Sequence, residues 1–252
     1  MSLQEWNDTS SKYYEEVLSP LKNSKENSLI KDLEDLGSEE KKALELGCGV
    51  GELIPVLSDN YGEVLATDFS PGMIEKAKEK IGESKNVTCE VLDVLKASTL
   101  KEKYDVVISV NSVLFTELKD VDNALNQMGK VTKKNGYLLI IVPAIEAMIY
   151  ESMLHTKKQI KQGKEQKDAM KESSELLETT KKELLQGIVG FDGSKQKAYY
   201  AFEIRHRLQK AGYEILSLEK VKYNWKDWEE AGREYYPKEE EPWDWYVKCR
   251  KK

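Results

Sequence analysis

Between residues 42 and 143 the sequence alternates short apolar segments with longer amphipathic ones. The apolar segments occupy residues 43–46, 64–67, 87–92, 105–110 and 137–142. Each is bounded by glycine or polar residues, as is typical of buried strands. Strands that alternate with helices pair in parallel, with right-handed crossovers. We therefore predict an α/β fold on a parallel sheet for this region.

Capping residues locate the helices between these strands. Ser70 as an N-cap and Pro71 at the first helical position predict a helix after the second strand. Residues 51–57 predict an earlier helix. The segment 121–134 predicts a later helix, which is closed by Asn135 and Gly136.

Before this region, the sequence predicts two further helices. An apolar stripe that starts at Trp6 predicts the first, and residues 24–36 predict the second, which ends at Gly37. The stripe continues through Tyr13, Tyr14, Val17 and Leu21.

After residue 143 the chain becomes highly charged and then returns to strands. Residues 144–190 predict a long helical insertion, with Gly163 as the candidate break of a hairpin, and residues 187–193 predict a loop. A helix over 200–211 precedes two strands, over 213–221 and 242–250. A terminal pair of strands after a parallel run predicts an antiparallel edge.

Composition narrows the class of protein. The 252 residues contain 39 Lys and Arg against 45 Asp and Glu, a formal net charge of −6. That balance argues against a sequence-independent hold on nucleic acid. The sequence shows neither an apolar run of membrane-spanning length nor a secretory signal. The cysteines, Cys48, Cys89 and Cys249, form no disulfide or metal motif, so we expect no metal site and a cytoplasmic location.

Polar groups and glycines stand at three successive strand ends. Gly47 and Gly49 follow the first strand, Asp68 follows the second, and Asp93 follows the third. Glycines there let the backbone approach a ligand, and a carboxylate about 20 residues on can accept both hydroxyls of a ribose. Asp93 could accept from an adenine amino group. The three strand ends together predict a nucleoside site at the carboxyl edge of the sheet.

The identity of the nucleoside depends on the glycine spacing. A dinucleotide fingerprint, G-x-G-x-x-G/A, would need a small residue where Glu52 stands. Glu52 would crowd the helix and place a carboxylate near a pyrophosphate. A cofactor without phosphates fits better, although a nicotinamide-dependent oxidoreductase remains an alternative.

The motifs at these strand ends are those of a known family. They are LELGCGVG at 44–51, ATDFSPGM at 66–73 and EVLDV at 90–94, with further matches at 104–114 and 136–141. In these motifs the chain resembles a class I S-adenosylmethionine-dependent methyltransferase of the small-molecule type. The resemblance implies a Rossmann-like three-layer sandwich: a mostly parallel seven-stranded sheet with an antiparallel C-terminal edge, plus a helical insertion.

The same resemblance implies S-adenosylmethionine as the cofactor, with S-adenosylhomocysteine as its product. Gly47 and Gly49 would pass under the methionine part of the cofactor, with Cys48 as the small residue between them. Glu45 would steady the ammonium, and Asp68 would bind the ribose hydroxyls.

Further residues are implied to contact the two ends of the cofactor. Those near the adenine are Phe69, Met73, Asp93 and Val94. Those near the methionine tail and the sulfonium are Ser109, Val110 and Asn111.

The catalytic residues are not predicted. Residues 114–117, LFTE, stand where many family members carry a histidine after the fourth strand, so no general base is evident. His155 on the insertion is a minor candidate for a substrate contact, and His206 is expected to be exposed. Glu146, Tyr150, Tyr199 and Tyr200 are further minor candidates, and aromatic residues between 225 and 245 could line a pocket or pack in the core.

We predict a single methyltransferase domain over residues 1–252. It comprises an N-terminal helical lid at 1–40, a cofactor-binding core at 42–143, an insertion at 144–200, and a C-terminal helix and strands at 201–252.

The predicted activity is methyl transfer to a small-molecule acceptor by in-line displacement, driven by positioning and desolvation. The alternative is a non-catalytic protein that binds the cofactor or its product and uses the insertion to hold a partner. The oligomeric state stays open.

Overall fold

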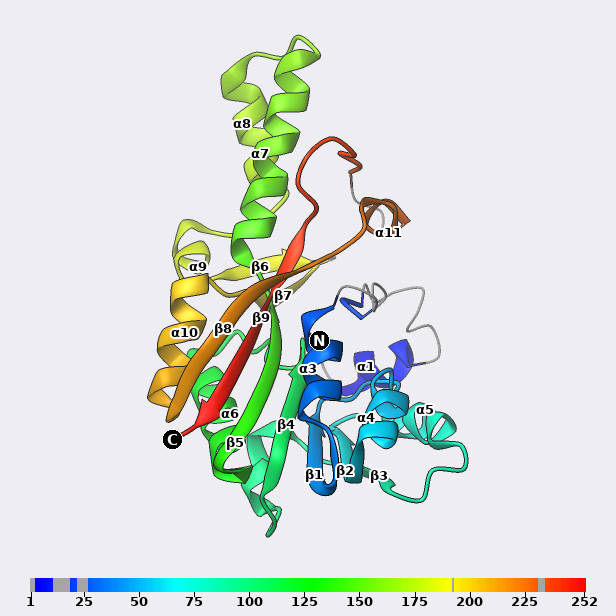
Figure 1. Cartoon of the computed structure of the whole chain (residues 1–252). Coiled ribbons are helices and arrows are strands. Elements are labelled where there is room, and N and C mark those ends of the chain that lie inside the picture. Colours follow the sequence, from blue (N-terminus) through cyan, green and yellow to red (C-terminus); the bar gives the residue numbers. More distant parts are fainter. Residues whose placement is uncertain (1–2, 11–18, 22–26, 192, 231–233) are drawn as a thin grey trace.

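The computed structural model describes residues 3–10, 19–21, 27–191, 193–230 and 234–252. Its centre is a seven-stranded sheet with the order β3-β2-β1-β4-β5-β9-β8 (Figure 1). The strands are β1 (Ser38–Leu46), β2 (Tyr61–Asp68), β3 (Val87–Val91), β4 (Tyr104–Val110), β5 (Thr132–Pro143), β8 (Tyr213–Lys222) and β9 (Trp243–Lys251). The first five pair in parallel, whereas β9 runs antiparallel to both of its neighbours. The predicted α/β fold with an antiparallel C-terminal edge is confirmed.

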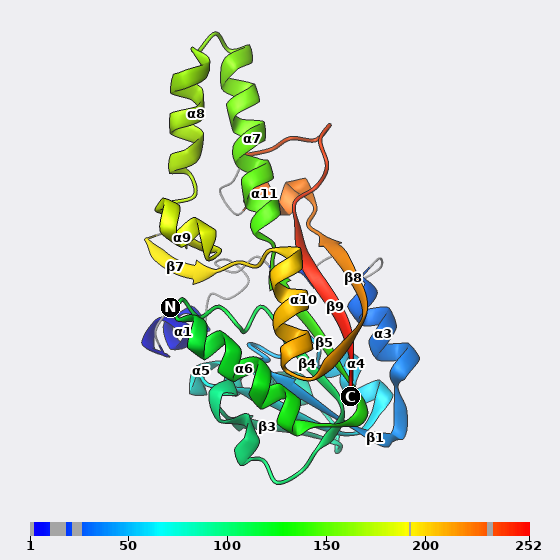
Figure 2. The ribbon, with the colours of Figure 1, turned by 90° about the vertical axis from the view of Figure 1, so that its left-hand side faces the viewer.

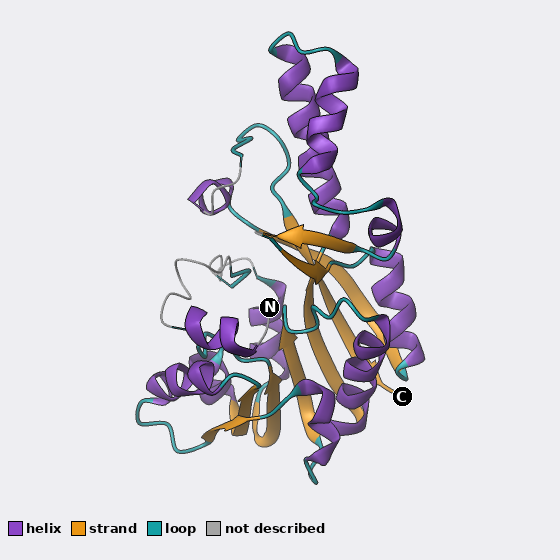
Figure 3. Cartoon of the chain, turned by 180° about the vertical axis from the view of Figure 1, so that it is seen from behind, coloured by secondary structure: helices purple, strands orange, loops and turns teal. Residues whose placement is uncertain are grey.

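Helices cover both faces of the sheet and make three layers (Figures 2 and 3). On one face, α3 (Ser28–Leu36), α4 (Ile54–Asn60) and α5 (Pro71–Ile81) bury apolar side chains against the strands. On the other face, the 3-10 helix η2 (Val94–Thr99), α6 (Leu118–Val131) and α10 (Ala201–Lys210) do the same. The two apolar layers follow from the alternation of side chains along each strand.

The predicted capping residues begin and end several of these helices. The Ser70 hydroxyl accepts from the Met73 amide at 3.1 Å, and Pro71 is the first residue of α5. Gly37 caps the end of α3 as predicted. The helix expected over 51–57 begins only at Ile54, because Gly51 is in the left-handed conformation, with φ +82°.

The predicted end of the helix over residues 121–134 is wrong. α6 ends at Val131, and β5 begins immediately at Thr132, so residues 135–136 lie in a strand rather than in a helix cap. The register shifts between the pairs Tyr104–Thr132 and Val106–Tyr137, which leaves extra residues on β5 as a bulge. The Asn-Gly pair therefore forms this bulge.

The insertion contains the predicted helical hairpin. Its helices are α7 (Ile145–Lys161), α8 (Gln166–Glu175) and α9 (Lys181–Leu185). Gly163, with φ +93°, lies in the turn between α7 and α8, as predicted. This hairpin projects away from the sheet in Figure 1.

The loop expected over 187–193 is instead part of a β-hairpin. It consists of β6 (Ile188–Phe191) and β7 (Ser194–Lys197), which pair antiparallel. Gly193, with φ +77°, permits the tight turn. The interpretation as a loop gave too much weight to the glycines and too little to the apolar residues between them.

Parts of the predicted N-terminal helix can be placed. Helix α1 (Leu3–Thr9) packs against α5, where the Asn7 side-chain oxygen accepts from the Ser70 hydroxyl at 2.6 Å and from the Gly72 amide at 3.1 Å. Trp6 is half-buried on this helix. Of the other stripe residues, Tyr13, Tyr14 and Val17 lie outside the described residues, and Leu21 lies in a turn rather than in the predicted helix. The lid stays a prediction. In the described C-terminal part of the chain, a further short helix is α11 (Trp225–Glu230).

Candidate functional site

The glycine loop after β1 is tied to the end of β2. The amides of Gly47 and Cys48 both donate to the Thr67 carbonyl at 2.8 Å. Gly47 and Gly49 have φ values of +82° and +53°, a conformation that other residues adopt at a cost. A Cβ on Gly47 would also lie 2.3 Å from the Ser112 Cβ. The two glycines therefore permit a turn that bends back over the edge of the sheet.

Asp68 joins this loop to the start of α5. One carboxylate oxygen accepts from the Gly49 amide at 3.0 Å, and the other accepts from the Ser70 amide at 2.9 Å. Burial raises the pKa of Asp68, and the backbone N–H donors oppose that rise. Each carboxylate oxygen has a second acceptor position, so Asp68 can also take hydrogen bonds from a ligand.

Glu45 is buried beside this carboxylate. It is 2% exposed, and no donor in the described part of the chain reaches its Oε2 atom. Burial, together with repulsion from Asp68 and Glu52, raises its pKa to about 8. A buried carboxylate oxygen without a donor costs free energy, and a ligand that supplies an N–H group would remove that cost. The residues present thus fit a cationic ligand group at this point.

The end of β3 lies next to the end of β2. The Leu92 amide donates to the Asp68 carbonyl at 2.9 Å, which places half-buried Asp93 one residue further along the same edge. Asp93 caps η2 by accepting from the Leu95 amide at 2.9 Å. Val94 follows it and is buried.

The two side chains expected to flank an adenine differ in exposure. Phe69 is 37% exposed, next to Asp68. Met73, a buried residue of α5, is 1% exposed, so it offers almost no surface to a ligand in this structure.

The end of β4 completes the edge. Ser109 is buried, and its hydroxyl lies 2.6 Å from that of Ser112. Val110 is half-buried. Asn111 is left-handed, with φ +46°, and its side-chain amide donates to an Asp244 oxygen at 2.7 Å. The register pairs Glu45 with Ile108, so Glu45 and Asn111 stand on adjacent strands at the same edge.

The sequence analysis missed Asp244 and its partner Tyr223. Asp244 is buried at the start of β9, and the Tyr223 hydroxyl, beyond the end of β8, donates to it at 2.5 Å. Burial raises the pKa of Asp244, opposed by donors that include the Ala144 amide. A single acid within the aromatic segment 243–246 was the available signal, since a carboxylate there must find donors inside the protein.

The histidines do not converge on these strand ends. His155 is half-buried, and its Nδ1 atom lies 2.9 Å from the Ser173 hydroxyl, between α7 and α8. Its Nε2 atom is 3.5 Å from a Glu234 oxygen. His206 is exposed on α10, as predicted.

The minor candidates on the insertion have partners within the fold. Glu146 accepts from the Ala201 amide at 2.8 Å and from the Trp245 indole at 3.0 Å. The Tyr199 hydroxyl donates to the Val113 carbonyl at 2.6 Å, and that of Tyr200 donates to the Leu184 carbonyl at 2.9 Å. The contacts of Glu146 and Tyr199 hold the insertion on the rest of the fold, whereas that of Tyr200 lies within the insertion.

The aromatic residues near the C-terminus mostly pack together. Trp225, Trp228, Tyr223 and Tyr236 form a buried cluster with Leu154 of α7. Tyr150 contacts the edge of this cluster and also Trp243, whose ring centre is 5.9 Å from its own. The packing interpretation therefore describes this segment better than an open pocket does.

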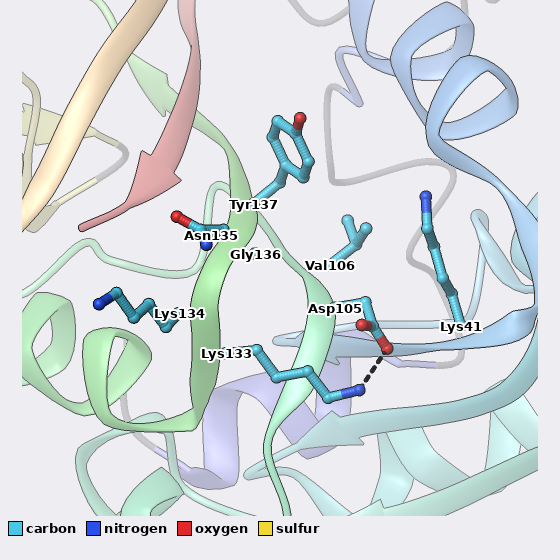
Figure 4. Close-up of a pocket in the computed structure, with 8 residues that line it drawn as sticks. All are labelled: Lys41, Asp105, Val106, Lys133, Lys134, Asn135, Gly136 and Tyr137. Atoms are coloured by element: carbon cyan, nitrogen blue, oxygen red, sulfur yellow. Dashed lines mark hydrogen bonds and ion pairs between the residues drawn. The ribbon is translucent and has the colours of Figure 1, made fainter.

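A cavity of about 250 Å³ lies at the opposite edge of the sheet. It is lined by the starts of β4 and β5 and by Lys41 (Figure 4). Lys133 forms an ion pair with Asp105 at 2.8 Å there, while Lys134 points to the other side of β5. This cavity is remote from every predicted site residue, so it is a different feature from the predicted site.

No group of three or more His, Cys, Asp or Glu side chains among the described residues could hold a metal ion. None of the helices described above is long and apolar enough to cross a membrane.

Comparison with known proteins agrees with this geometry. A family model for methyltransferase domains matches residues 43–136, which carry the first three strand ends and β4. Malonyl-[acyl-carrier protein] O-methyltransferase of Acetivibrio thermocellus is 36% identical over 115 residues, covering 44% of this chain and 39% of the relative. The chain therefore matches about two fifths of that relative's length.

Solved structures extend the likeness beyond the core. A SAM-dependent methyltransferase of Methanosarcina mazei has a TM-score of 0.62 at 13% identity, covering 89% of this chain and 97% of that one. The N-methyltransferase NodS of Bradyrhizobium japonicum, in complex with S-adenosyl-L-homocysteine, has a TM-score of 0.58 at 12% identity, covering 97% and 98%. The methyltransferase domain model thus matches residues 43–136, and the solved structures share the predicted fold, a mostly parallel seven-stranded sheet with an antiparallel edge.

Proposed function

We propose that this protein is an S-adenosylmethionine-dependent methyltransferase that acts on a small-molecule acceptor. The observation that carries the proposal is the set of three joined strand ends, in which Asp68 bonds both the glycine loop and the start of α5. It lies inside the segment that matches the methyltransferase domain family. When bound, the cofactor supplies an activated methyl group on a sulfonium.

Each strand end has a separate task in binding. The free acceptor positions of Asp68 take the ribose hydroxyls, and Asp93 accepts from the adenine amino edge, with Phe69 against the ring. Glu45 offers its unpartnered Oε2 atom to the ammonium of the methionine tail. Charge-assisted hydrogen bonds of this kind are about twice as strong as neutral ones, so these carboxylates dominate affinity.

For the reaction itself, the chain contributes position and the exclusion of water. An in-line displacement from a sulfonium needs a base only when the acceptor must lose a proton. The segment 114–117 after β4 carries no histidine, and the Leu114 carbonyl accepts from the Lys197 amide of the insertion at 3.1 Å. The insertion thus fixes the segment beside the acceptor and contributes to desolvation.

The class of acceptor is inferred from the charge of the chain and from one relative. The net charge of −6 disfavours nucleic acid, and the relative from Acetivibrio thermocellus is named for a malonyl group on a carrier protein. We therefore propose that the acceptor is a small acid or amine. An acyl group bound to a carrier is a second form of the same acceptor class.

The test is a screen for S-adenosylhomocysteine formation. The purified protein is incubated with S-adenosylmethionine and with free acids, amines, phenols and carrier-bound acyl groups. Acceptor-dependent product formation that is lost in Asp68→Ala supports the proposal. Tight cofactor binding without turnover of any acceptor class would favour a non-catalytic binding protein instead.

A further inference from the structure

A buried carboxylate and tyrosine lie behind one of the predicted cofactor contacts. Asp244 comes from the start of β9, Tyr223 follows β8, and Asn111 follows β4. Asp244 Oδ2 accepts from the Asn111 side-chain amide at 2.7 Å and from the Tyr223 hydroxyl at 2.5 Å. Three segments that are distant in the sequence thus meet at a single oxygen.

This contact fixes which way the Asn111 amide points. Its NH₂ group must face the carboxylate, because the opposite orientation would set two acceptor oxygens against each other. Its Oδ1 atom is therefore directed away from Asp244. Oδ1 is buried, and it meets no donor among the residues described here.

The unpartnered oxygen has a counterpart on the next strand. Glu45 Oε2 is also buried and lacks a donor in the described chain. Both atoms belong to the carboxyl edge of the paired strands β1 and β4. Two buried acceptors without donors at the same edge of the sheet match a group that carries several N–H bonds, and an ammonium carries three.

We propose that Asp244 and Tyr223 are positioning residues that hold Asn111 Oδ1 ready to accept a hydrogen bond from the ammonium of the cofactor's methionine tail. This inference rests on the proposed function, since it concerns the same cofactor. It adds a task for the antiparallel edge of the sheet: β8 and β9 contribute to cofactor binding through Asn111, without touching the cofactor.

Asp244→Asn tests the orientation with little change of shape. The substitution replaces one acceptor oxygen by an NH₂ group, so the donors around it no longer all find an acceptor. Residue 244 then no longer presents acceptors alone, so either end of the Asn111 amide can face it and the ammonium loses an acceptor of fixed orientation. Asn111→Ala removes the same acceptor directly and is the second variant.

The readout compares two ligands by calorimetry at a fixed pH. S-Adenosylhomocysteine carries the amino-acid tail, whereas 5′-methylthioadenosine has the same nucleoside and a thioether but no tail. We expect Asp244→Asn and Asn111→Ala each to weaken S-adenosylhomocysteine about tenfold, as for one lost hydrogen bond to a charged group, and to leave 5′-methylthioadenosine unchanged. The double variant is expected to be no weaker than Asn111→Ala alone, because Asp244 acts through Asn111.

Asp32→Asn is the matched control. Asp32 also accepts from a β9 tyrosine, Tyr246, at 2.6 Å, and from Lys248 at 2.6 Å, but it lies on α3, and Asn111 is not among these partners. We expect it to leave the ratio of the two affinities unchanged. Equal weakening of both ligands by Asp244→Asn, or additive losses in the double variant, would overturn the inference. Failure of the wild-type protein to bind S-adenosylhomocysteine would instead overturn the proposed function.

Discussion

The glycine loop at residues 47–51 and the insertion at residues 144–200 both lie beyond the carboxyl edge of the sheet, but different forces hold them. The loop is fixed by backbone hydrogen bonds to Thr67 and by left-handed glycines. The insertion is fixed at a few points, by side chains such as the Tyr199 hydroxyl on the Val113 carbonyl and by backbone bonds such as the Lys197 amide on the Leu114 carbonyl. Its helices carry surface ion pairs such as Lys164–Glu172.

This difference separates two tasks. A site made of backbone and buried carboxylates accepts few substitutions, which suits a ligand that does not vary. Helices that are held on the core at only a few points can change in sequence without disturbing the core. Such helices suit the recognition of an acceptor. We therefore expect substitutions in the loop to change both cofactor binding and stability. Substitutions in the insertion are expected to change stability without changing cofactor binding.

The largest expected effect is a loss of stability at Gly47, and Gly163, which is also left-handed, is its comparison. Gly47→Ala combines an unfavourable φ with a Cβ placed 2.3 Å from that of Ser112, so we expect a loss of about 2–5 kcal/mol in unfolding free energy. Gly163→Ala, in the hairpin turn, has a similar φ but meets no atom within 4 Å. It is expected to cost no more than about 1–2 kcal/mol and to leave cofactor affinity unchanged. Urea unfolding measures both, and equal losses would contradict the comparison.

The second prediction concerns pH and Glu45. Its pKa is about 8 in the folded protein against 4.5 ordinarily, so between these values the folded state holds a proton that the unfolded chain has released. Stability from this group is therefore lost as the pH rises from 4.5 to 8. Glu45→Gln should exceed the wild type in unfolding free energy at pH 8 by on the order of 3 kcal/mol, and the gap should close near pH 4.5.

The control for this prediction is a carboxylate of the insertion. Lys195 and the cap of α9 lower the pKa of Glu183 to about 2, so this group is ionised in the folded state throughout the same window and in the unfolded chain above about pH 5.5. Glu183→Gln should therefore leave the slope of stability between about pH 5.5 and pH 8 as it is in the wild type. A wild-type slope of zero would show that Glu45 is not protonated in the folded state.

Asp68→Ala is expected to have the third largest effect. Loss of its charge-assisted bonds to the ribose should cost about 1.5–3 kcal/mol of cofactor binding, or roughly 10- to 150-fold in affinity. Calorimetric titration with S-adenosylhomocysteine measures this loss, and circular dichroism checks the fold. Unchanged affinity in a folded variant would mean that Asp68 has been assigned the wrong role.

The smallest expected effect lies at the junction of the two regions. Tyr199→Phe leaves the Val113 carbonyl without its donor inside the protein, at a cost of about 1–2 kcal/mol. Tyr200→Phe removes a half-buried bond within the insertion and should cost less. Hydrogen exchange should speed up at residues 113–114 in the first variant only. The same exchange pattern in both variants would show that Tyr199 does not anchor the insertion.

The core was predictable because each of its signals is local. Ser70 and Pro71 mark the start of α5, and the spacing from Gly47 to Asp68 reflects one strand–helix–strand unit. Asp244 and its partner Tyr223 were missed because Asp244 contacts Asn111 across 133 residues of sequence, and no periodicity encodes such a pairing. The bulge at residues 135–136 was missed because an Asn-Gly pair also suits the end of a helix.

The most direct test of the account is calorimetric titration of the wild-type protein with S-adenosylhomocysteine, S-adenosylmethionine and NADH. The joined strand ends predict binding of both adenosyl ligands and none of NADH, because Glu52 stands where a pyrophosphate would need a small residue. Binding of NADH alone, or of none of the three by folded protein, would contradict the central claim that this edge of the sheet is a site for S-adenosylmethionine.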